Sequence, residues 1–458
     1  MPFFIAINFH NEAGISNQRD PNIIILKMSY FNNTCDPIFI DGIAGGIGAH
    51  NWTWAQNQPW CTYIASNEIY YIENLTINGG STNSCIEIRN SNVNLIIRNC
   101  TLYNSTNSPN DAGLNLINVS NSQIIENNCT NNPYHGIRIY NSSDNRIYLN
   151  SLNDNYVRGL IISGSNNTEI SNNTFINTPY PRDSVYGIDC TGNCFNLTIS
   201  NNTIIGNQLE GIIINKLSNS TISNNKINNN GQRGISFSGD SIGNTIKNNK
   251  IYENAHEGIF LNTLSSNNNF TENEIYENGR DGMVLNSMST LNNILDNEIY
   301  ENGGYGLSLD FYCNDNKIIG NKINNNDDHG IILSDNSGNI IIRNEANDNA
   351  EFGIKLENSN NSIIFNNTAS YVGLGNQQQS GIVVGQNSNN NTILHNTVAS
   401  NFWQGIYLQN ANFNNITANM LNNNSNDIVI YSSNNTIVIG NSVNARNFDI
   451  MKQILKII

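Results

Sequence analysis

Charged and histidine side chains recur at the two positions directly before a glycine that is followed by an aliphatic residue. These glycine pairs return mostly every 23 or 24 residues, so residues one repeat apart can be neighbours in the fold. Carboxylate, imidazole and guanidinium groups in one row could supply general acid–base catalysis. Alternating charges in such a row can also simply neutralise one another. The candidate catalytic residues are Arg233, His256, Glu257, Arg280, Asp281 and His329, and Glu210, Tyr305 and Asp328 are candidate substrate-binding residues.

Three repeats are longer, with a spacing of 28 residues. The extra residues fall in "TLYNSTNSPNDAG", "NTPYPRDSVYG" and "YVGLGNQQQSG", each ending at the recurrent glycine. Long loops on a repeat protein often flank a binding region. Tyr180, Arg182, Asp183 and Tyr186 of the second insertion would then form one wall of that region. Neutral drift in a tolerant turn explains the insertions equally well.

A short acidic segment is a candidate for cation binding. "NNNDDHG" (324–330) holds Asp327, Asp328 and His329, but its spacing matches no strict motif such as an EF-hand. The six histidines and six methionines are scattered along the chain and form no close constellation of soft ligands. We therefore assign no metal ligand and expect no resident cofactor, with a divalent cation at this turn as the alternative.

A regular repeat must position all of these residues. Glycine pairs run from Gly113-Leu114 to Gly405-Ile406, and degenerate copies at Cys85-Ile86 and Asp427-Ile428 bring the total to 15 units. Each unit holds three short runs of alternating or β-branched apolar residues, which is typical of strands. Stacked units of this kind predict an all-β parallel solenoid of about 15 coils with three short strands per coil.

An asparagine column keeps the same period. Stacked amides can hydrogen-bond to one another, and we expect the same asparagines to adopt the left-handed conformation that a sharp turn requires. The members of the column are Asn128, Asn150, Asn173, Asn202, Asn225, Asn249, Asn273, Asn297, Asn321, Asn344, Asn367, Asn396 and Asn419.

The two ends of the solenoid need covers, because open coils expose sheet edges and core. The off-period segment 36–84 is the predicted N-terminal cap, and the repeats span 85–444. Residues 445–458 carry apolar side chains at helical spacing and predict a C-terminal cap helix. Residues 1–35 fit neither part and are expected to be a poorly ordered segment.

Tryptophan and cysteine each leave two interpretations open. Trp52, Trp54 and Trp60 in the cap can plug the core or offer rings to a sugar, and Trp403 precedes a recurrent glycine. The eight cysteines can form disulfides, which would imply export, or pack as small buried side chains.

Charge and hydropathy argue against a nucleic-acid partner and against a transmembrane segment. The formal net charge is −15 and no basic stripe is present, which argues against nucleic acid. No run of about 18 apolar residues is present, so the sequence predicts no transmembrane segment. An acidic, weakly charged surface is compatible with neutral glycans.

The "G-I-x-(I/L)…N-x-I-x-x-N-x-I" coil resembles the right-handed parallel β-helix repeats of the pectin-lyase-like superfamily, in particular its asparagine-rich NosD-like group. The resemblance covers about residues 85–444. It implies a right-handed coil, an extracellular or cell-surface location and a polysaccharide or surface glycan as partner. The NosD-like group also carries a copper association.

Three functions follow as alternatives. The first is a secreted or cell-surface structural protein that binds carbohydrate. The second is a polysaccharide lyase, uronan epimerase or glycoside hydrolase that uses the polar row before the glycines. The third is a NosD-like copper accessory protein. Against catalysis, the outward position two residues after each glycine carries mostly apolar side chains, such as Ile161, Phe260 and Ile332, whereas Arg138 and Asp189 depart from this pattern.

Overall fold

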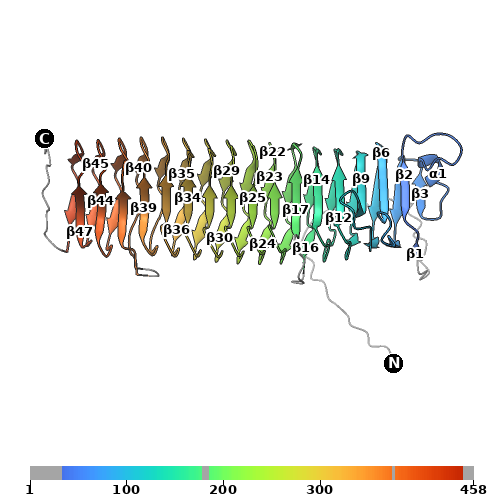
Figure 1. Cartoon of the computed structure of the whole chain (residues 1–458), viewed down its shortest axis with the longest axis horizontal. Helices are drawn as coiled ribbons and strands as arrows, with labels where there is room; N and C mark the ends of the chain where they lie inside the picture. The colour runs from blue at the N-terminus through green and yellow to red at the C-terminus, as the bar shows by residue number, and fades with distance from the viewer. Residues whose placement is uncertain (1–33, 178–184, 374–376, 447–458) are drawn as a thin grey trace, which may run out of the picture. The chain divides into compact units, whose positions relative to one another are not determined.

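A computed structural model describes residues 34–177, 185–373 and 377–446 of the chain. These residues form 49 short strands and a one-turn helix, α1 (Trp52–Ala55). Almost every strand pairs in parallel with the strands of the preceding and following coils. The coils therefore stack one on the next (Figure 1). The predicted all-β solenoid of about 15 coils is confirmed, and the coils from β6 onward hold two to four strands each, most often the predicted three.

One sheet positions the candidate site, and we call it the long sheet. Each of its strands from β9 onward contains or directly follows a recurrent glycine or its degenerate copy. Its 16 strands, in spatial order, are β2 (Ile38–Asp41), β6 (Ile86–Ser91), β9 (Ala112–Val119), β12 (His135–Tyr140), β14 (Arg158–Ser163), β17 (Tyr186–Thr191), β21 (Ile212–Ile214), β25 (Ile235–Phe237), β28 (Ile259–Leu261), β31 (Met283–Leu285), β34 (Leu307–Asp310), β37 (Ile331–Ser334), β39 (Phe352–Glu357), β41 (Ser380–Val384), β44 (Gln404–Gln409) and β47 (Asn426–Tyr431).

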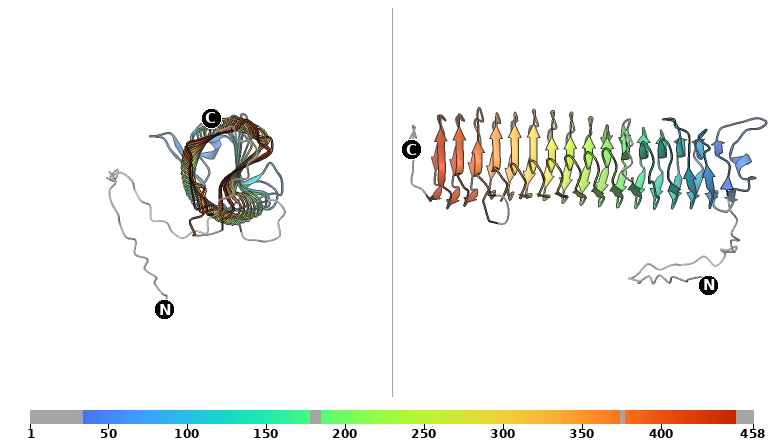
Figure 2. Two further views of the ribbon diagram at one scale, coloured as in Figure 1. Left: turned by 90° about the vertical axis from the view of Figure 1, so that its left-hand side faces the viewer. Right: turned by 60° about the horizontal axis from the view of Figure 1, so that its bottom comes forward.

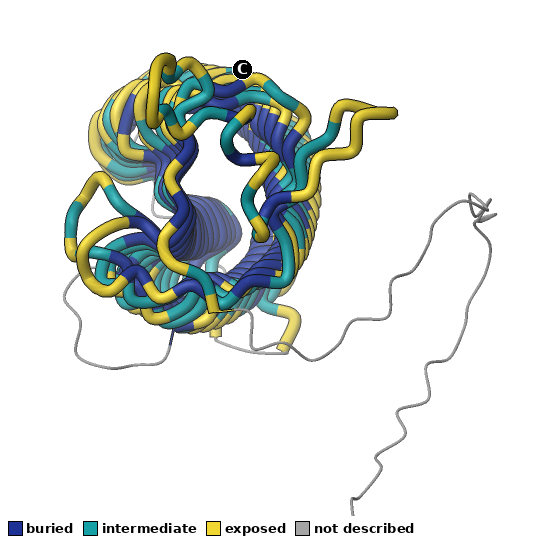
Figure 3. The backbone as a smooth tube through the Cα atoms, turned by 90° about the vertical axis from the view of Figure 1, so that its right-hand side faces the viewer, coloured by how far each residue is buried: buried dark blue, intermediate teal, exposed yellow. Residues whose placement is uncertain are grey.

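Two more sheets complete each coil. In one coil, β28 is followed by β29 (Asn269–Thr271) and β30 (Glu274–Tyr276). The central residue of each of these short strands points inward, and Ile275 lies in register with Ile251 and Ile299 of the adjacent coils. Seen end-on the coils superpose (Figure 2), and buried backbone lines their inner side (Figure 3). Like side chains thus stack on like along the whole core, as the period predicts.

Buried asparagines form a hydrogen-bonded ladder at the turn between the second and third strands of each coil. Nδ2 of Asn225 donates to Oδ1 of Asn249 over 2.9 Å, and Nδ2 of Asn249 donates to Oδ1 of Asn273 over 3.0 Å. The predicted column is confirmed from Asn150 onward. Its first member is Asn127 and not Asn128, whose side chain is exposed.

The prediction that the ladder asparagines themselves adopt the left-handed conformation is wrong. The residue before each of them does so, as in Asn248 (φ 53°), Glu272 (φ 54°) and Asp296 (φ 53°). A ladder asparagine is needed for the hydrogen bonds of its buried side chain, whose Oδ1 also accepts from the backbone N–H of the ladder asparagine in the preceding coil. Two consecutive residues therefore share the work: the first adopts the left-handed turn conformation, and the second is the asparagine of the ladder. The turn position also accepts residues other than asparagine.

The stack begins within the segment predicted as a cap. β2 pairs in register with β6, and β1 (Thr34–Cys35) pairs with β5 (Thr76–Asn78). Beside them lie α1 and the antiparallel hairpin of β3 (Cys61–Ile64) and β4 (Ile69–Glu73). Trp52 is buried in the core, and its Nε1 donates to Oγ of Ser91 over 2.8 Å, so this tryptophan plugs the core. Residues 1–33 and nearly all of the predicted C-terminal helix lie outside the described residues.

All eight cysteines lie in the described ranges, and none of them forms a disulfide. Seven are buried, and burial raises the pKa of their thiols, for Cys61 to about 11. They pack as small apolar side chains. Within the described ranges, no helix is long and apolar enough to cross a membrane.

Candidate functional site

The outer face of the long sheet carries a row of side chains that we call the pre-glycine column. A Cβ on Gly258 would lie 2.5 Å from Cγ2 of Ile275, so the glycine backbone packs onto the core and the residue before it points outward. Backbone hydrogen bonds hold successive members side by side. The column runs through Ala112, His135, Arg158, Tyr186, Glu210, Arg233, Glu257, Asp281, Tyr305, His329, Phe352, Ser380, Gln404 and Asn426.

Three predicted catalytic residues form ion pairs: Arg233 and Glu257 in the middle of the column, and Arg280 one residue before it. Nε of Arg233 lies 2.7 Å from Oε2 of Glu257, and its Nη1 lies 3.4 Å from Oε1 of Glu210. Nη1 of Arg280 lies 3.6 Å from Oε1 of Glu257. The Arg233 guanidinium also lies 4.1 Å from the centre of the Phe260 ring. Positive and negative groups thus alternate along the coils, and each guanidinium is engaged by a carboxylate.

Asp281 is the acidic member of the column whose protonation is most perturbed. Its Oδ1 accepts a hydrogen bond from the backbone N–H of Tyr305 over 2.8 Å, which favours the charged form. Burial outweighs this bond and, with the nearby Glu257 carboxylate, raises the pKa of Asp281 to about 6. Burial also raises the pKa of Tyr305 to about 12. His256 lies one residue before the column, half-buried, and its backbone N–H donates to Gln232.

His329 lies in an aromatic stack with two acids beside it. Its ring stacks between Tyr305 and Phe352, with centroid distances of 5.3 and 4.8 Å. Nδ1 lies 3.1 Å from Oδ1 of Asp328 and 3.5 Å from Oε2 of Glu351. Burial, with the charge of Lys355, lowers the pKa of His329 to about 3, so its imidazole is neutral at neutral pH.

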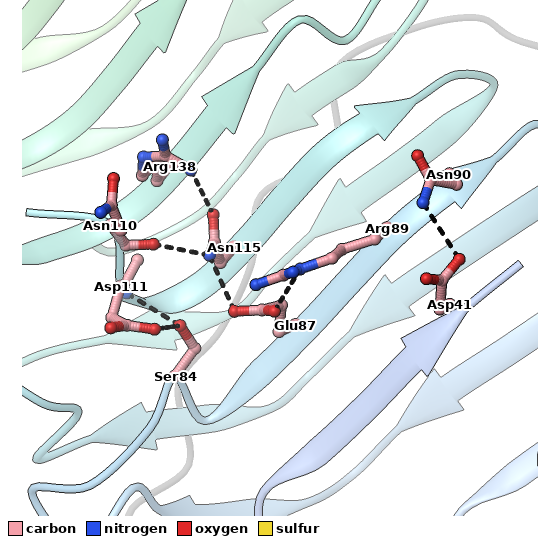
Figure 4. A network of polar contacts seen from close by, with 10 residues as sticks. Asp41, Ser84, Glu87, Arg89, Asn90, Asn110, Asp111, Asn115 and Arg138 are labelled. Carbon is pink, nitrogen blue, oxygen red and sulfur yellow. Dashed lines mark hydrogen bonds and ion pairs between the residues drawn. The ribbon is translucent and has the colours of Figure 1, made fainter. Parts of the chain in front are cut away.

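The first coils carry a polar network that the sequence did not predict as a site (Figure 4). Oε1 of Glu87 pairs with Nε of Arg89 at 2.6 Å, and Oε2 accepts from Nδ2 of Asn115 over 3.0 Å. Oδ1 of Asn115 in turn accepts from Nη1 of Arg138 over 3.1 Å. The first insertion joins the network, since the carbonyl of Asn110 also accepts from Nδ2 of Asn115. The departure of Arg138 from the apolar pattern was the one signal of this network in the sequence.

The same face continues with a second paired group. Nε of Arg158 donates to Oδ2 of Asp189, and the guanidinium lies 5.4 Å from the centre of the Tyr186 ring. Burial lowers the pKa of His135 to about 3, and only 1% of this residue is exposed. Tyr186 therefore lies on the predicted face, whereas Tyr180, Arg182 and Asp183 lie outside the described residues.

An aromatic pocket lies on the same face in the last coils. It has a volume of about 290 Å³ and is lined by Phe352, Ser380, Trp403, Gln404, Tyr407, Val429 and Tyr431. Trp403 and Tyr431 are about half exposed, at 45% and 54%. Oγ of Ser380 donates to Oε1 of Gln404 over 2.9 Å. Of these residues the sequence singled out only Trp403. Tyr407, which stands at the outward position two residues after a recurrent glycine, could also have indicated an aromatic surface on this face.

The chain belongs to the family described as the right-handed β-helix region, which matches residues 38–204, 186–323 and 292–443. Similar solved structures include the A-module of mannuronan C-5 epimerase AlgE6 of Azotobacter vinelandii, with 17% identity over 77% of this chain and 90% of that one and a TM-score of 0.48. The periplasmic alginate epimerase AlgG is 14% identical over 88% and 84%, with a TM-score of 0.43. Pectate lyase Pel9A is 13% identical over 50% and 69%, with a TM-score of 0.36. No curated protein matches the sequence.

Proposed function

We propose that the protein binds a polysaccharide along the outer face of the long sheet, with one sugar ring held in the aromatic pocket. The pocket is the observation that carries the proposal. Pockets that hold small ligands are typically lined by aromatic side chains with a few polar groups that fix orientation, and they start at about 300 Å³. The volume of about 290 Å³ suits one ring of a longer chain.

The lining specifies the chemistry of the sugar. No charged residue is among the lining residues, which favours a neutral ring over a uronate. The exposed rings of Trp403 and Tyr431 offer apolar faces to the C–H groups of a pyranose. The Gln404 amide carries two N–H donors that suit sugar hydroxyls, and the Ser380 hydroxyl orients this amide by donating to its Oε1.

A row of half-buried tyrosines elsewhere on the molecule is less suited to this role. The rings of Tyr252, Tyr276 and Tyr300 stack face to face at the ends of the paired strands β27 (Lys250–Tyr252), β30 and β33 (Glu298–Tyr300), with centroid distances of 4.8 and 5.0 Å and nearly parallel planes. Each ring covers the face of the next, so a sugar would meet mainly ring edges. This tyrosine stack supports the fold, whereas the pocket leaves ring surface free.

Size-exclusion chromatography with a panel of neutral and uronic polysaccharides tests the proposal. We expect co-elution with at least one neutral polysaccharide, without shortening of the glycan. The Trp403→Ala variant is expected to lose this co-elution. Phe402→Ala is the matched control, because Phe402 is similarly exposed at 49% but does not line the pocket. Binding only to uronic chains, or equal binding by both variants, would contradict the proposal.

A second candidate function is modification of the polysaccharide, and the perturbed Asp281 favours it. A carboxyl group with a pKa near 6 is suited to act as a general acid or base close to neutral pH. Its neighbours on the column are the Glu257 carboxylate and Tyr305. If this function is correct, a glycan that co-elutes with wild type is shortened or epimerised over time, and Asp281→Asn abolishes the change without abolishing binding.

Extracellular or cell-surface location remains a proposal tied to the glycan. If the ligand is an envelope or matrix polysaccharide, fractionation of the native cells is expected to place the protein outside the cytoplasm. Recovery only from the cytoplasmic fraction would contradict this location. The copper accessory role stays a prediction.

A further inference from the structure

We propose that Asp328, His329 and Glu351 form a binding site for a divalent transition-metal ion of the Zn²⁺ class. The site goes beyond glycan binding and does not depend on it. Asp328 and His329 directly precede Gly330 and β37, and Glu351 directly precedes β39 on the next coil. The ligand atoms that these three side chains offer all lie within 4.8 Å of one another.

The first argument is the stacking of two like charges. The backbone N–H of Glu351 donates to the carbonyl of Asp328 over 3.2 Å, so the two acids occupy the same position on successive coils. In the middle of the face, by contrast, Arg233 separates Glu210 from Glu257. Asp328 and Glu351 have the His329 imidazole between them and no guanidinium, and the nearby Lys355 forms its ion pair with Glu357. A bound cation would remove this repulsion.

The second argument is independent of charge and concerns unsatisfied polar atoms. Within the described residues, Nδ1 of His329 and Oδ1 of Asp328 are both buried and have no hydrogen-bond partner, although they lie 3.1 Å apart. A buried polar atom without a partner costs about 1–3 kcal/mol, so native proteins rarely leave one without a reason. Only 3% of the His329 side chain is exposed, and its Nδ1 faces both carboxylates.

The distances suit direct coordination. Zn²⁺ binds imidazole nitrogen and carboxylate oxygen at about 2.0–2.2 Å, which places neighbouring tetrahedral ligand atoms about 3.3–3.6 Å apart. Octahedral coordination at about 2.1 Å places them about 3.0 Å apart. The observed separations from Nδ1 are 3.1 Å to Asp328 and 3.5 Å to Glu351. The Glu351 side chain is 46% exposed, so it can adjust and leave a position open to water.

The scaffold holds the central ligand in place. The His329 ring is stacked between Tyr305 and Phe352, which restricts its rotation. One imidazole with two carboxylates favours Zn²⁺ or Mn²⁺ over Cu(I), which prefers sulfur ligands, and over Ca²⁺, which takes six to eight oxygens. Preorganisation of this kind is what a metal site requires from its surroundings.

Equilibrium dialysis of the full chain against Zn²⁺ at neutral pH tests the site. We expect wild type to bind one Zn²⁺ per chain more than His329→Gln. Glu351→Gln is expected to weaken binding by at least about tenfold, the lower end of the effect of removing even an outer-shell partner. Glu357→Gln is the matched control, because its side chain has the same exposure of 46% and lies at the far end of β39, the strand that Glu351 precedes. It is expected to bind like wild type.

Two outcomes would overturn the site. The first is equal Zn²⁺ binding by wild type, Glu351→Gln and His329→Gln, since the metal would then lie elsewhere. The second is displacement of Zn²⁺ by equimolar Ca²⁺, since an all-oxygen site would then be responsible. Glu351→Gln keeps the test valid if His329→Gln fails to fold, because Glu351 is half exposed, and circular dichroism checks the folding of each variant.

Discussion

Replacing Arg233 by Met tests whether the charges in the middle of the pre-glycine column support the fold. The substitution leaves Glu210 and Glu257, with side chains only 7% and 9% exposed, without the guanidinium that lies between them. Removing one partner of a buried ion pair costs about 3–5 kcal/mol. Arg233 is itself 23% exposed, and Arg280 remains 3.6 Å from Glu257, so we expect the lower part of that range, about 3 kcal/mol.

The assay is urea unfolding followed by circular dichroism, with a compensating variant as control. Replacing a whole buried ion network by neutral groups of similar volume is often neutral or stabilising. The triple variant Arg233→Met, Glu210→Gln, Glu257→Gln is therefore expected to recover most of the lost stability. A loss below about 1 kcal/mol in the single variant, or no recovery in the triple, would refute this reasoning.

Two further predictions concern the ladder and Asp281. Asn249→Ala leaves the backbone N–H of Asn225 and the carbonyl of Ile222 without their side-chain partners, so we expect a loss of about 2–4 kcal/mol, measured by urea unfolding. Asn248→Ala, at the exposed turn position, should cost about 1 kcal/mol, and equal losses would contradict the division of roles. Asp281→Asn keeps the acceptor for Tyr305. Because the folded pKa of Asp281 is raised from 3.8 to about 6, its charged form destabilises the fold, fully above about pH 6 and not at all below about pH 4. The variant should be about 2–3 kcal/mol more stable than wild type at pH 8 and should lose this advantage at pH 4. An advantage that does not change with pH would contradict the assignment.

The fold was predictable because the same pattern of glycine, asparagine and apolar residues recurs in successive coils. The spacing of the glycine pairs predicted which residues share a column, and the structure confirms that Glu210, Arg233 and Glu257 are neighbours. The sequence could not decide between an acid–base row and mutual neutralisation, since that depends on side-chain distances of a few ångströms. The 2.7 Å contact of Arg233 with Glu257 favours neutralisation.

The remaining parts of the candidate site depend on side-chain contacts that the spacing of the repeats does not predict. Tyr431 reaches the pocket from the end of β47, and Glu351 approaches His329 only because the coils stack in register. The network around Asn115 was missed because Asn110 belongs to an insertion without a repeat partner. Asn128 was placed in the ladder because it shares the type of Asn127, and only the direction of the side chains distinguishes them.

The most direct test of glycan binding is calorimetric titration of the best neutral polysaccharide into wild type, Trp403→Ala and Phe402→Ala. Loss of an aromatic contact at the centre of a binding site costs at least about 1.4 kcal/mol, which is a tenfold change in affinity. We predict that Trp403→Ala binds at least about tenfold more weakly than wild type and that Phe402→Ala binds with unchanged affinity. Unchanged affinity in Trp403→Ala, with the variant folded, would contradict the account.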